Sequence, residues 1–106
     1  MRRGEIWWVN FDPAQGGEIR KKRPAVIVSN DKSNAAQNRL QVVPTTSAAG
    51  TIYPWEAPVR IGGRMNKAMA DQIRTVAKVR LGNKIGAVTA DEMQAIEDAI
   101  RLQLGL

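Results

Sequence analysis

Four consecutive cations at residues 20–23 form the part of this chain best suited to chemistry, because they lie between a glycine pair and an apolar run. Pro24 fixes its own φ angle and favours an extended backbone at Arg23, so a mobile cationic loop is expected to lead into a rigid strand. A fixed arginine beside movable cations suits recognition of a phosphodiester, whose oxygens match the guanidinium fork. The structural alternative is an ion pair of Arg23 with Glu18 or Glu5 at the rim of a sheet.

Hydroxyl groups and one carboxylate are the other candidates for chemistry. Thr45, Thr46 and Ser47 end a β-like run, where a hydroxyl held by the strand can donate to a phosphate oxygen. Glu18 is the nearest carboxylate in the cationic loop and is a candidate base. It is equally readable as an exposed charge that balances its neighbours.

The chain contains neither histidine nor cysteine, which excludes the usual zinc sites, cysteine nucleophiles and histidine proton shuttles. Catalysis is left to carboxylates, hydroxyls, arginines, lysines, Tyr53 or backbone amides. No close cluster of Asp and Glu indicates a magnesium site, so we expect neither a metal nor another cofactor. The lack of cysteine, of an apolar signal segment and of a membrane-spanning run predicts a cytoplasmic protein.

The formal net charge of +6 is unevenly spread. Residues 1–86 carry 15 cations and 6 anions, a charge of +9, whereas residues 87–106 carry 1 cation and 4 anions, a charge of −3. A basic body with an acidic end favours an anionic partner, nucleic acid first, although many basic proteins have no such partner.

Most of the chain reads as short strands, and a length of 106 residues predicts a single domain over residues 1–106. Runs rich in β-branched and aromatic residues, bounded by Gly, Pro or Asn, predict strands at 6–11, 25–29, 40–46, 55–61 and 69–76. Pro44 should make its strand an edge strand or a bulge at that point. Turns are expected at 12–17, 47–51 and 62–63, and residues 31–39 are either a short helix or irregular. The pattern predicts a mainly β protein built as a small barrel or strongly twisted sheet.

The C-terminal segment predicts a helix. Thr89 and Glu92 have the spacing of a capping box, and Val88 and Met93 that of a hydrophobic staple. Apolar residues then recur with helical spacing at 93, 96, 100 and 104. We expect this helix to pack on the barrel and to take no part in chemistry.

Five stretches in order resemble the MazF/PemK (Kid) family of RNA-cutting toxins from type II toxin–antitoxin pairs. The resemblance runs nearly from end to end and rests on residues 3–13 (RGEIWWVNFDP), 16–30 (a Gly-x-Glu loop and Arg-Pro-x-x-x-x-Ser-Asn), 42–47 (VVPTTS), 53–56 (YPWE) and 70–75 (ADQIRT). It implies a small barrel of the type shared by SH3 domains and the gyrase poison CcdB, with a packed C-terminal helix.

The resemblance also implies roles for individual residues. Arg23 would be the central catalytic arginine and Thr46 its partner, with Thr45 and Ser47 supporting substrate contacts. Some relatives use an aspartate at the position of Asp71 with an arginine two residues earlier. Here that earlier position is Met69, and Gly17 stands where several relatives have His or Ser, so two parts of that variant mechanism are missing. The substrate-binding residues are expected to be Arg20, Lys21, Lys22, Thr45, Ser47, Trp55, Asp71 and Gln72, beside the catalytic set Arg23, Thr46 and Glu18.

Trp55 enters this set because unpaired RNA bases stack on exposed aromatic rings. It follows the loop after Thr46, although a core or dimer-interface aromatic is an equal alternative. Trp7 and Trp8 should point to opposite faces of their strand, so at most one of them is an ordinary core residue.

The resemblance implies a sequence-specific, metal-independent endoribonuclease for single-stranded RNA, which leaves 2′,3′-cyclic phosphate (or 3′-phosphate) and 5′-hydroxyl ends. It further implies a homodimer whose groove binds RNA and is blocked by an acidic antitoxin similar to MazE. Two alternatives remain: a non-enzymatic toxin directed at gyrase, and an RNA-binding barrel without catalysis. Arg23 and Thr46 in their expected contexts favour the nuclease.

Overall fold

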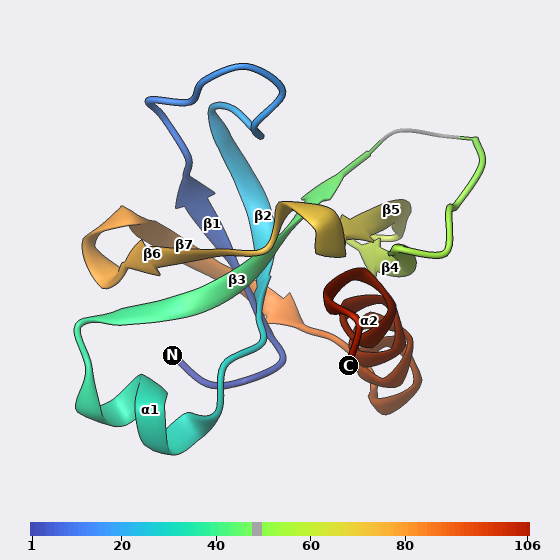
Figure 1. Ribbon diagram of the computed structural model, residues 1–106. Helices are drawn as coiled ribbons and strands as arrows, with labels where there is room; N and C mark the ends of the chain where they lie inside the picture. Colours follow the sequence, from blue (N-terminus) through green and yellow to red (C-terminus); the bar gives the residue numbers. More distant parts are fainter. Residues whose placement is uncertain (48–49) are drawn as a thin grey trace.

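The computed structural model describes residues 1–47 and 50–106, so Ala48 and Ala49, within the turn expected at 47–51, lie outside the described residues. Figure 1 shows the chain as a curled sheet with a helix packed on one side. The strands are β1 (Glu5–Asn10), β2 (Lys22–Ile27), β3 (Arg39–Thr46), β4 (Glu56–Ile61), β5 (Arg64–Met69), β6 (Arg74–Ala77) and β7 (Leu81–Ala87). The helices are α1 (Asp31–Ala36) and α2 (Ala90–Leu104), with two short 3-10 helices, η1 (Ala70–Gln72) and η2 (Lys78–Arg80).

The sheet is antiparallel in every pair that it forms, and its strands follow the order β4-β5-β3-β2-β1-β7. The remaining strand, β6, pairs with the first half of β3. The long strand β3 therefore changes partner along one side, from β6 at residues 39–42 to β5 at residues 45–46, and Pro44 falls in between. This curled half-barrel with a C-terminal helix confirms the predicted mainly β fold (Figure 1). The edge or bulge expected at Pro44 is wrong on one side of β3, where Pro44 pairs with Ala25 of the neighbouring strand β2.

Two apolar cores lie on opposite faces of the sheet, because alternate residues of a strand point to opposite sides. Val26 of β2 belongs to the core beneath α2, whereas its neighbours Ala25 and Ile27 belong to the core that contains Phe11. All three β2 residues are fully buried, as the continuous apolar run predicted. Strand β2 is thus packed against an apolar core on both of its faces.

Helix α2 begins as predicted. Thr89 Oγ1 accepts from the Glu92 backbone N–H at 3.1 Å, and Glu92 Oε1 accepts from the Thr89 N–H at 2.8 Å, so the capping box is complete. Ile96 and Ala99 are buried against the sheet, but Leu104 is 52% exposed and does not continue the packed stripe. In the described part of the chain, no helix is long and apolar enough to cross a membrane.

The strand expected at 69–76 is wrong. The chain leaves β5 at Met69, turns through η1, and resumes as β6 at Arg74. The turn is held by a hydrogen bond from the Ile73 N–H to the Ala70 carbonyl at 3.2 Å, and the Ala70 N–H donates to the Trp55 carbonyl at 3.0 Å. The turn also directs Gln72 toward the loop between β1 and β2, which matters for the site below.

Candidate active site

Arg23 lies at the start of β2, half-buried, with its guanidinium held from one side. Its Nε donates to the carbonyl of Arg20 at 3.0 Å. Among the described residues neither Nη1 nor Nη2 of Arg23 has a hydrogen-bond or ion-pair partner. The alternative ion pair with Glu5 or Glu18 does not form, since Glu5 is paired with Lys84 at 2.8 Å and Glu18 lines a different cavity. Two terminal amino groups of Arg23 are therefore available to an anion.

Arg23 lines a cavity of about 410 Å³, here called the Arg23 cavity, which forms where β1, β2, β3, β4 and β5 meet. The structure thus brings together six of the residues predicted from the sequence. The cavity is lined by Trp8, Lys21, Lys22, Arg23, Pro24, Thr45, Thr46, Ser47, Ile61, Arg64 and Asn66.

The three hydroxyl groups at the end of β3 differ in their availability. Thr45 is fully buried, and its hydroxyl donates to the Pro24 carbonyl at 2.8 Å. Thr46 is half-buried and Ser47 exposed, and in the described structure neither hydroxyl has a hydrogen-bond partner. Thr46 and Ser47 can therefore donate to a ligand, whereas Thr45 joins β3 to β2 beside Arg23.

The Arg23 cavity is strongly positive. Lys21, Lys22, Arg23 and Arg64 line it, and none of the four forms an ion pair within residues 1–47 and 50–106. No lining residue carries a carboxylate. Unneutralised cations around hydroxyl donors are the composition expected of a site for a phosphodiester.

The loop between β1 and β2 is closed at its base, directly before Arg23. The Phe11 N–H donates to the Lys21 carbonyl at 2.9 Å, and the Lys21 N–H donates to Asp12 Oδ1 at 3.0 Å. Arg80 Nη1 donates to the Asp12 carbonyl at 2.6 Å. Lys21 has a φ of 65°, a left-handed conformation that is uncommon for a residue with a side chain and is often found at functional sites. The cationic loop is thus anchored where it enters the strand.

Glu18, Asp71 and Gln72 do not reach the Arg23 cavity. They line a neighbouring cavity of about 330 Å³ together with Ile19, Ile73 and Arg74. Gln72 uses both ends of its amide on the loop: Oε1 accepts from the Ile19 N–H, and Nε2 donates to the Gly17 carbonyl, each at 3.2 Å. Glu18 Oε1 accepts from the Gln15 N–H at 2.6 Å. Gln72 therefore positions the loop, and the roles predicted for Glu18 and Asp71 stay predictions.

Two further predicted residues, Trp55 and Arg20, do not line the Arg23 cavity. Trp55 is 38% exposed and stacks on Tyr53, with ring centroids 5.2 Å apart and an interplanar angle of 4°. The Lys67 Nζ lies 5.7 Å from the centroid of the Tyr53 ring and forms an ion pair with Glu56 at 3.2 Å. Arg20 contributes its carbonyl to Arg23. The base contact predicted for Trp55 and the substrate contact predicted for Arg20 stay predictions.

Sequence reasoning did not assign Trp8, Arg64 or Asn66 to the site. Arg64 and Asn66 are alternate residues of β5 and so share one face of that strand, a signal that requires knowing that the segment after the Gly62-Gly63 turn is a strand. Trp8 is 44% exposed, whereas Trp7 is half-buried against the core that contains Phe11, which confirms that the two rings point to opposite faces.

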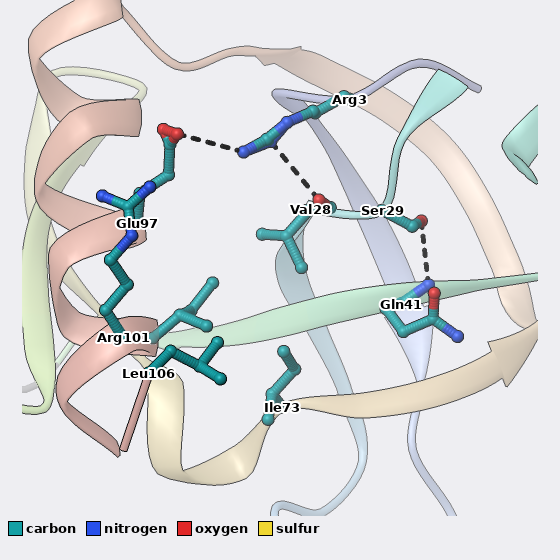
Figure 2. A pocket seen from close by; sticks show the side chains of 9 residues that line it. Arg3, Val28, Ser29, Gln41, Ile73, Glu97, Arg101 and Leu106 are labelled. Atoms are coloured by element: carbon teal, nitrogen blue, oxygen red, sulfur yellow. Dashed lines mark hydrogen bonds and ion pairs between the residues drawn. The ribbon is translucent and has the colours of Figure 1, made fainter. Parts of the chain in front are cut away.

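Another cavity, of about 320 Å³, lies between α2 and the sheet (Figure 2). Its charged groups are largely satisfied within the protein. Arg3 pairs with Glu97 at 3.3 Å and donates to the Val28 carbonyl, and Ser29 Oγ accepts from the Gln41 N–H at 3.0 Å. This cavity ties the N-terminal segment to α2 and lacks the unneutralised charge of the Arg23 cavity.

The largest pKa shift among the described residues is that of Glu5, at the start of β1. The hydrogen bond from Lys84 lowers the pKa of Glu5 to about 2, against the opposing effect of burial, and the Arg2 N–H and Trp7 Nε1 donors lower it further. Within the described residues, no group of three or more side chains is arranged to hold a metal ion.

The match to known proteins extends over nearly the whole chain. A sequence model of the PemK-like, MazF-like toxins of type II toxin–antitoxin systems matches residues 2–104, so the chain belongs to this toxin family and the resemblance seen in the sequence is confirmed. The endoribonuclease MazF9 of Mycobacterium tuberculosis is 44% identical over 115 residues, covering 100% of this chain and 98% of the relative.

Solved structures agree with this assignment. The crystal structure of MazF from Deinococcus radiodurans matches with a TM-score of 0.87 and 27% identity, over 100% of this chain and 97% of that one. A mycobacterial endoribonuclease in complex with its cognate antitoxin matches with a TM-score of 0.83 and 27% identity, over 100% and 96% of the two chains.

Proposed function

We propose that this toxin is an endoribonuclease that cuts single-stranded RNA at a short sequence without a metal ion. The observation that carries the proposal is the Arg23 cavity, which is lined by Arg23, Thr46 and Ser47 among cations without ion-pair partners in the described residues. Family membership and the endoribonuclease relative support the same reaction.

The reaction is an attack of the RNA 2′-oxygen on the adjacent phosphorus. The bond from phosphorus to the 5′-oxygen breaks, the proton of the 2′-hydroxyl is removed, and a proton is delivered to the leaving 5′-oxygen. The products are a 2′,3′-cyclic phosphate, or a 3′-phosphate after hydrolysis, and a 5′-hydroxyl.

Arg23 and Thr46 stabilise the transition state of this reaction. As charge develops on the non-bridging phosphate oxygens, the two amino groups of Arg23 and the Thr46 hydroxyl donate to them. The Arg20 carbonyl holds Nε of Arg23, so the fork is oriented before the substrate arrives. Because no carboxylate lines the cavity, a water molecule is the simplest proton acceptor, and Glu18 takes that role only if its loop moves.

The positive charge of the Arg23 cavity also supports an acidic protein partner. We propose that the toxin acts in the cytoplasm as a homodimer and that an acidic segment of an antitoxin neutralises the Arg23 cavity. The cations of this cavity lack internal carboxylate partners in the described part of the chain, so an acidic peptide would compete with RNA for them. The relative solved in complex with its cognate antitoxin supports this assignment.

The test is incubation of the antitoxin-free protein with a long single-stranded RNA in excess EDTA, with mapping of the cut ends. We expect discrete cuts with 5′-hydroxyl ends, and a fall of about 10²- to 10³-fold in rate for Arg23→Ala. Arg39→Ala is the matched control, because Arg39 is exposed at the opposite end of β3 from Thr46 and should leave cutting unchanged.

Three results would contradict the proposal. Cuts that appear only with added magnesium would refute the metal-independent mechanism. RNA binding by folded protein without any cutting would favour the non-catalytic barrel. Failure both to bind and to cut RNA would favour a toxin directed at another target, such as gyrase.

A further inference from the structure

Trp8 stands between the Arg23 cavity and a second hollow. The second hollow has a volume of about 220 Å³, and Trp8 and Lys22 are the two residues that line both. The Trp8 side chain is 44% exposed, which is high for a ring in an inner strand flanked by β2 and β7. The indole therefore forms a wall that a ligand in either cavity can touch.

An irregularity in β7 creates this second hollow. Trp7 pairs with Lys84 and Val9 pairs with Leu81, so β7 has one extra residue opposite Trp8, as in a β-bulge. Gly82 lies there without a side chain, and a Cβ added to it would stand 3.6 Å from the Trp8 Cβ. The space next to the indole is thus left by the bulge and by this glycine.

The chemistry of the lining suits a nucleobase and its phosphate. Arg80 is fixed through Nη1, which donates to the carbonyls of Asn10 at 3.1 Å and Asp12 at 2.6 Å. Within the described structure, Arg80 and Lys22 form no ion pair with a carboxylate. The hollow therefore combines an aromatic face, two cations and the polar side chain of Asn10.

We propose that Trp8 is a stacking platform for the nucleobase adjacent to the cleaved phosphodiester, and that this base lies in the hollow between Trp8 and Arg80. Single-stranded nucleic acids are held by aromatic faces along a cationic path, and each stacked base contributes appreciably to affinity. Because Lys22 borders both cavities, it contacts the phosphate at Arg23 from the side on which the base lies on Trp8. This inference rests on the proposed function and adds a base-binding position to it.

The first test follows Trp8 directly by fluorescence. In the double variant Trp7→Phe, Trp55→Phe, Trp8 is the single remaining tryptophan. Titration with a fully 2′-O-methylated RNA of mixed sequence, which cannot undergo the 2′-hydroxyl reaction, should quench its fluorescence saturably. Binding detected by anisotropy of the labelled RNA with unchanged Trp8 fluorescence would overturn the inference.

The second test uses variants and measures affinity for the same RNA. We expect Trp8→Ala to weaken binding by about tenfold, the scale of one lost stack, and Trp8→Phe to recover most of it. Gly82→Leu should also weaken binding, because its side chain fills the hollow, while the ordinary 3.6 Å contact at its Cβ lets the fold accept it. Gly86→Leu is the control, since Gly86 lies in the same strand as Gly82 and a Cβ added to it would meet no atom within 4 Å.

Thermal melting of each variant separates folding from binding. Wild-type affinity in folded Trp8→Ala and Gly82→Leu would overturn the inference while leaving RNA cutting in EDTA intact. Conversely, quenching of Trp8 by RNA in a protein that never cuts would support the base-binding position and refute the proposed cleavage. The two failures are therefore distinguishable.

Discussion

The hydroxyl of Thr45 donates to the carbonyl of Pro24 at 2.8 Å, across the pairing of β3 with β2. This bond joins the residue before Thr46 to the residue after Arg23. The distance between the two proposed catalytic residues is therefore set by two neighbouring strands, and not by the loops that surround the cavity. Pairing of Ala25 with Pro44 extends the same connection into the core.

We expect Thr45→Val to lower the free energy of unfolding by about 1–2 kcal/mol, because the valine keeps the shape of the buried Thr45 but leaves the half-buried Pro24 carbonyl without this donor. Urea unfolding followed by circular dichroism measures the change. A variant as stable as wild type would show that this bond contributes nothing to holding β2 and β3 together.

In contrast to Thr45→Val, Thr46→Val should lower the rate of RNA cleavage and leave stability nearly unchanged. The hydroxyl of Thr46 has no partner in the described residues, so its removal should change stability by less than about 0.5 kcal/mol. The cleavage rate should fall by about 10- to 100-fold, because a donor to the phosphate is lost, and Thr46→Ser should recover much of it. Full cleavage by Thr46→Val would remove Thr46 from the mechanism.

Gln72→Ala should loosen the β1–β2 loop. The amide of Gln72 makes two hydrogen bonds to this loop, and loss of about 1 kcal/mol would speed exchange of the Ile19 N–H by about fivefold. Hydrogen exchange followed by NMR measures it. Asp71→Ala is the neighbouring control, since Asp71 is exposed and its carboxylate makes no hydrogen bond within the described chain. Equal exchange in the two variants would contradict the positioning role.

The depressed pKa of Glu5 predicts how stability depends on pH. The folded-state pKa is about 2, below the ordinary value of 4.5, so this stabilisation is present above pH 4.5 and is lost as the pH falls toward 2. Glu5→Gln should lower the free energy of unfolding at pH 7 by about 2 kcal/mol and flatten its decline between pH 5 and 2. Urea unfolding at several pH values measures both effects. An unchanged decline in Glu5→Gln would assign the acid sensitivity to other carboxylates.

Local patterns in the sequence predicted the elements whose causes are local. The capping box at Thr89, the apolar run of β2 and the strand at β4 are each specified by adjacent residues, and all three formed as expected. Strand β7 was missed, because Gly82 and Gly86 weaken its pattern and its side chains are mostly exposed. Its pairing with β1 depends on the order of the sheet, which no short stretch of sequence contains.

The candidate site likewise contains residues that local sequence patterns predicted and residues that only the fold brings there. Arg23 and Thr46 were predicted together and lie on adjacent strands, so the pairing of β2 with β3 brings them to one cavity. Trp8 and Arg64 were not assigned to the site, because they reach the cavity only through the positions of β1 and β5. Glu18 was grouped with Arg23 because the two are close in sequence, yet the loop between them directs it toward Gln72 instead.

The closed base of the β1–β2 loop separates the tip of this loop from Arg23. Phe11 bonds to Lys21, Lys21 bonds to Asp12, and Arg80 bonds to Asp12. These hydrogen bonds close the loop before the chain reaches Arg23. Residues 13–18 can therefore vary in composition or number while Arg23 keeps its orientation. We expect an exchange confined to the tip of this loop to leave the proposed reaction at Arg23 unchanged.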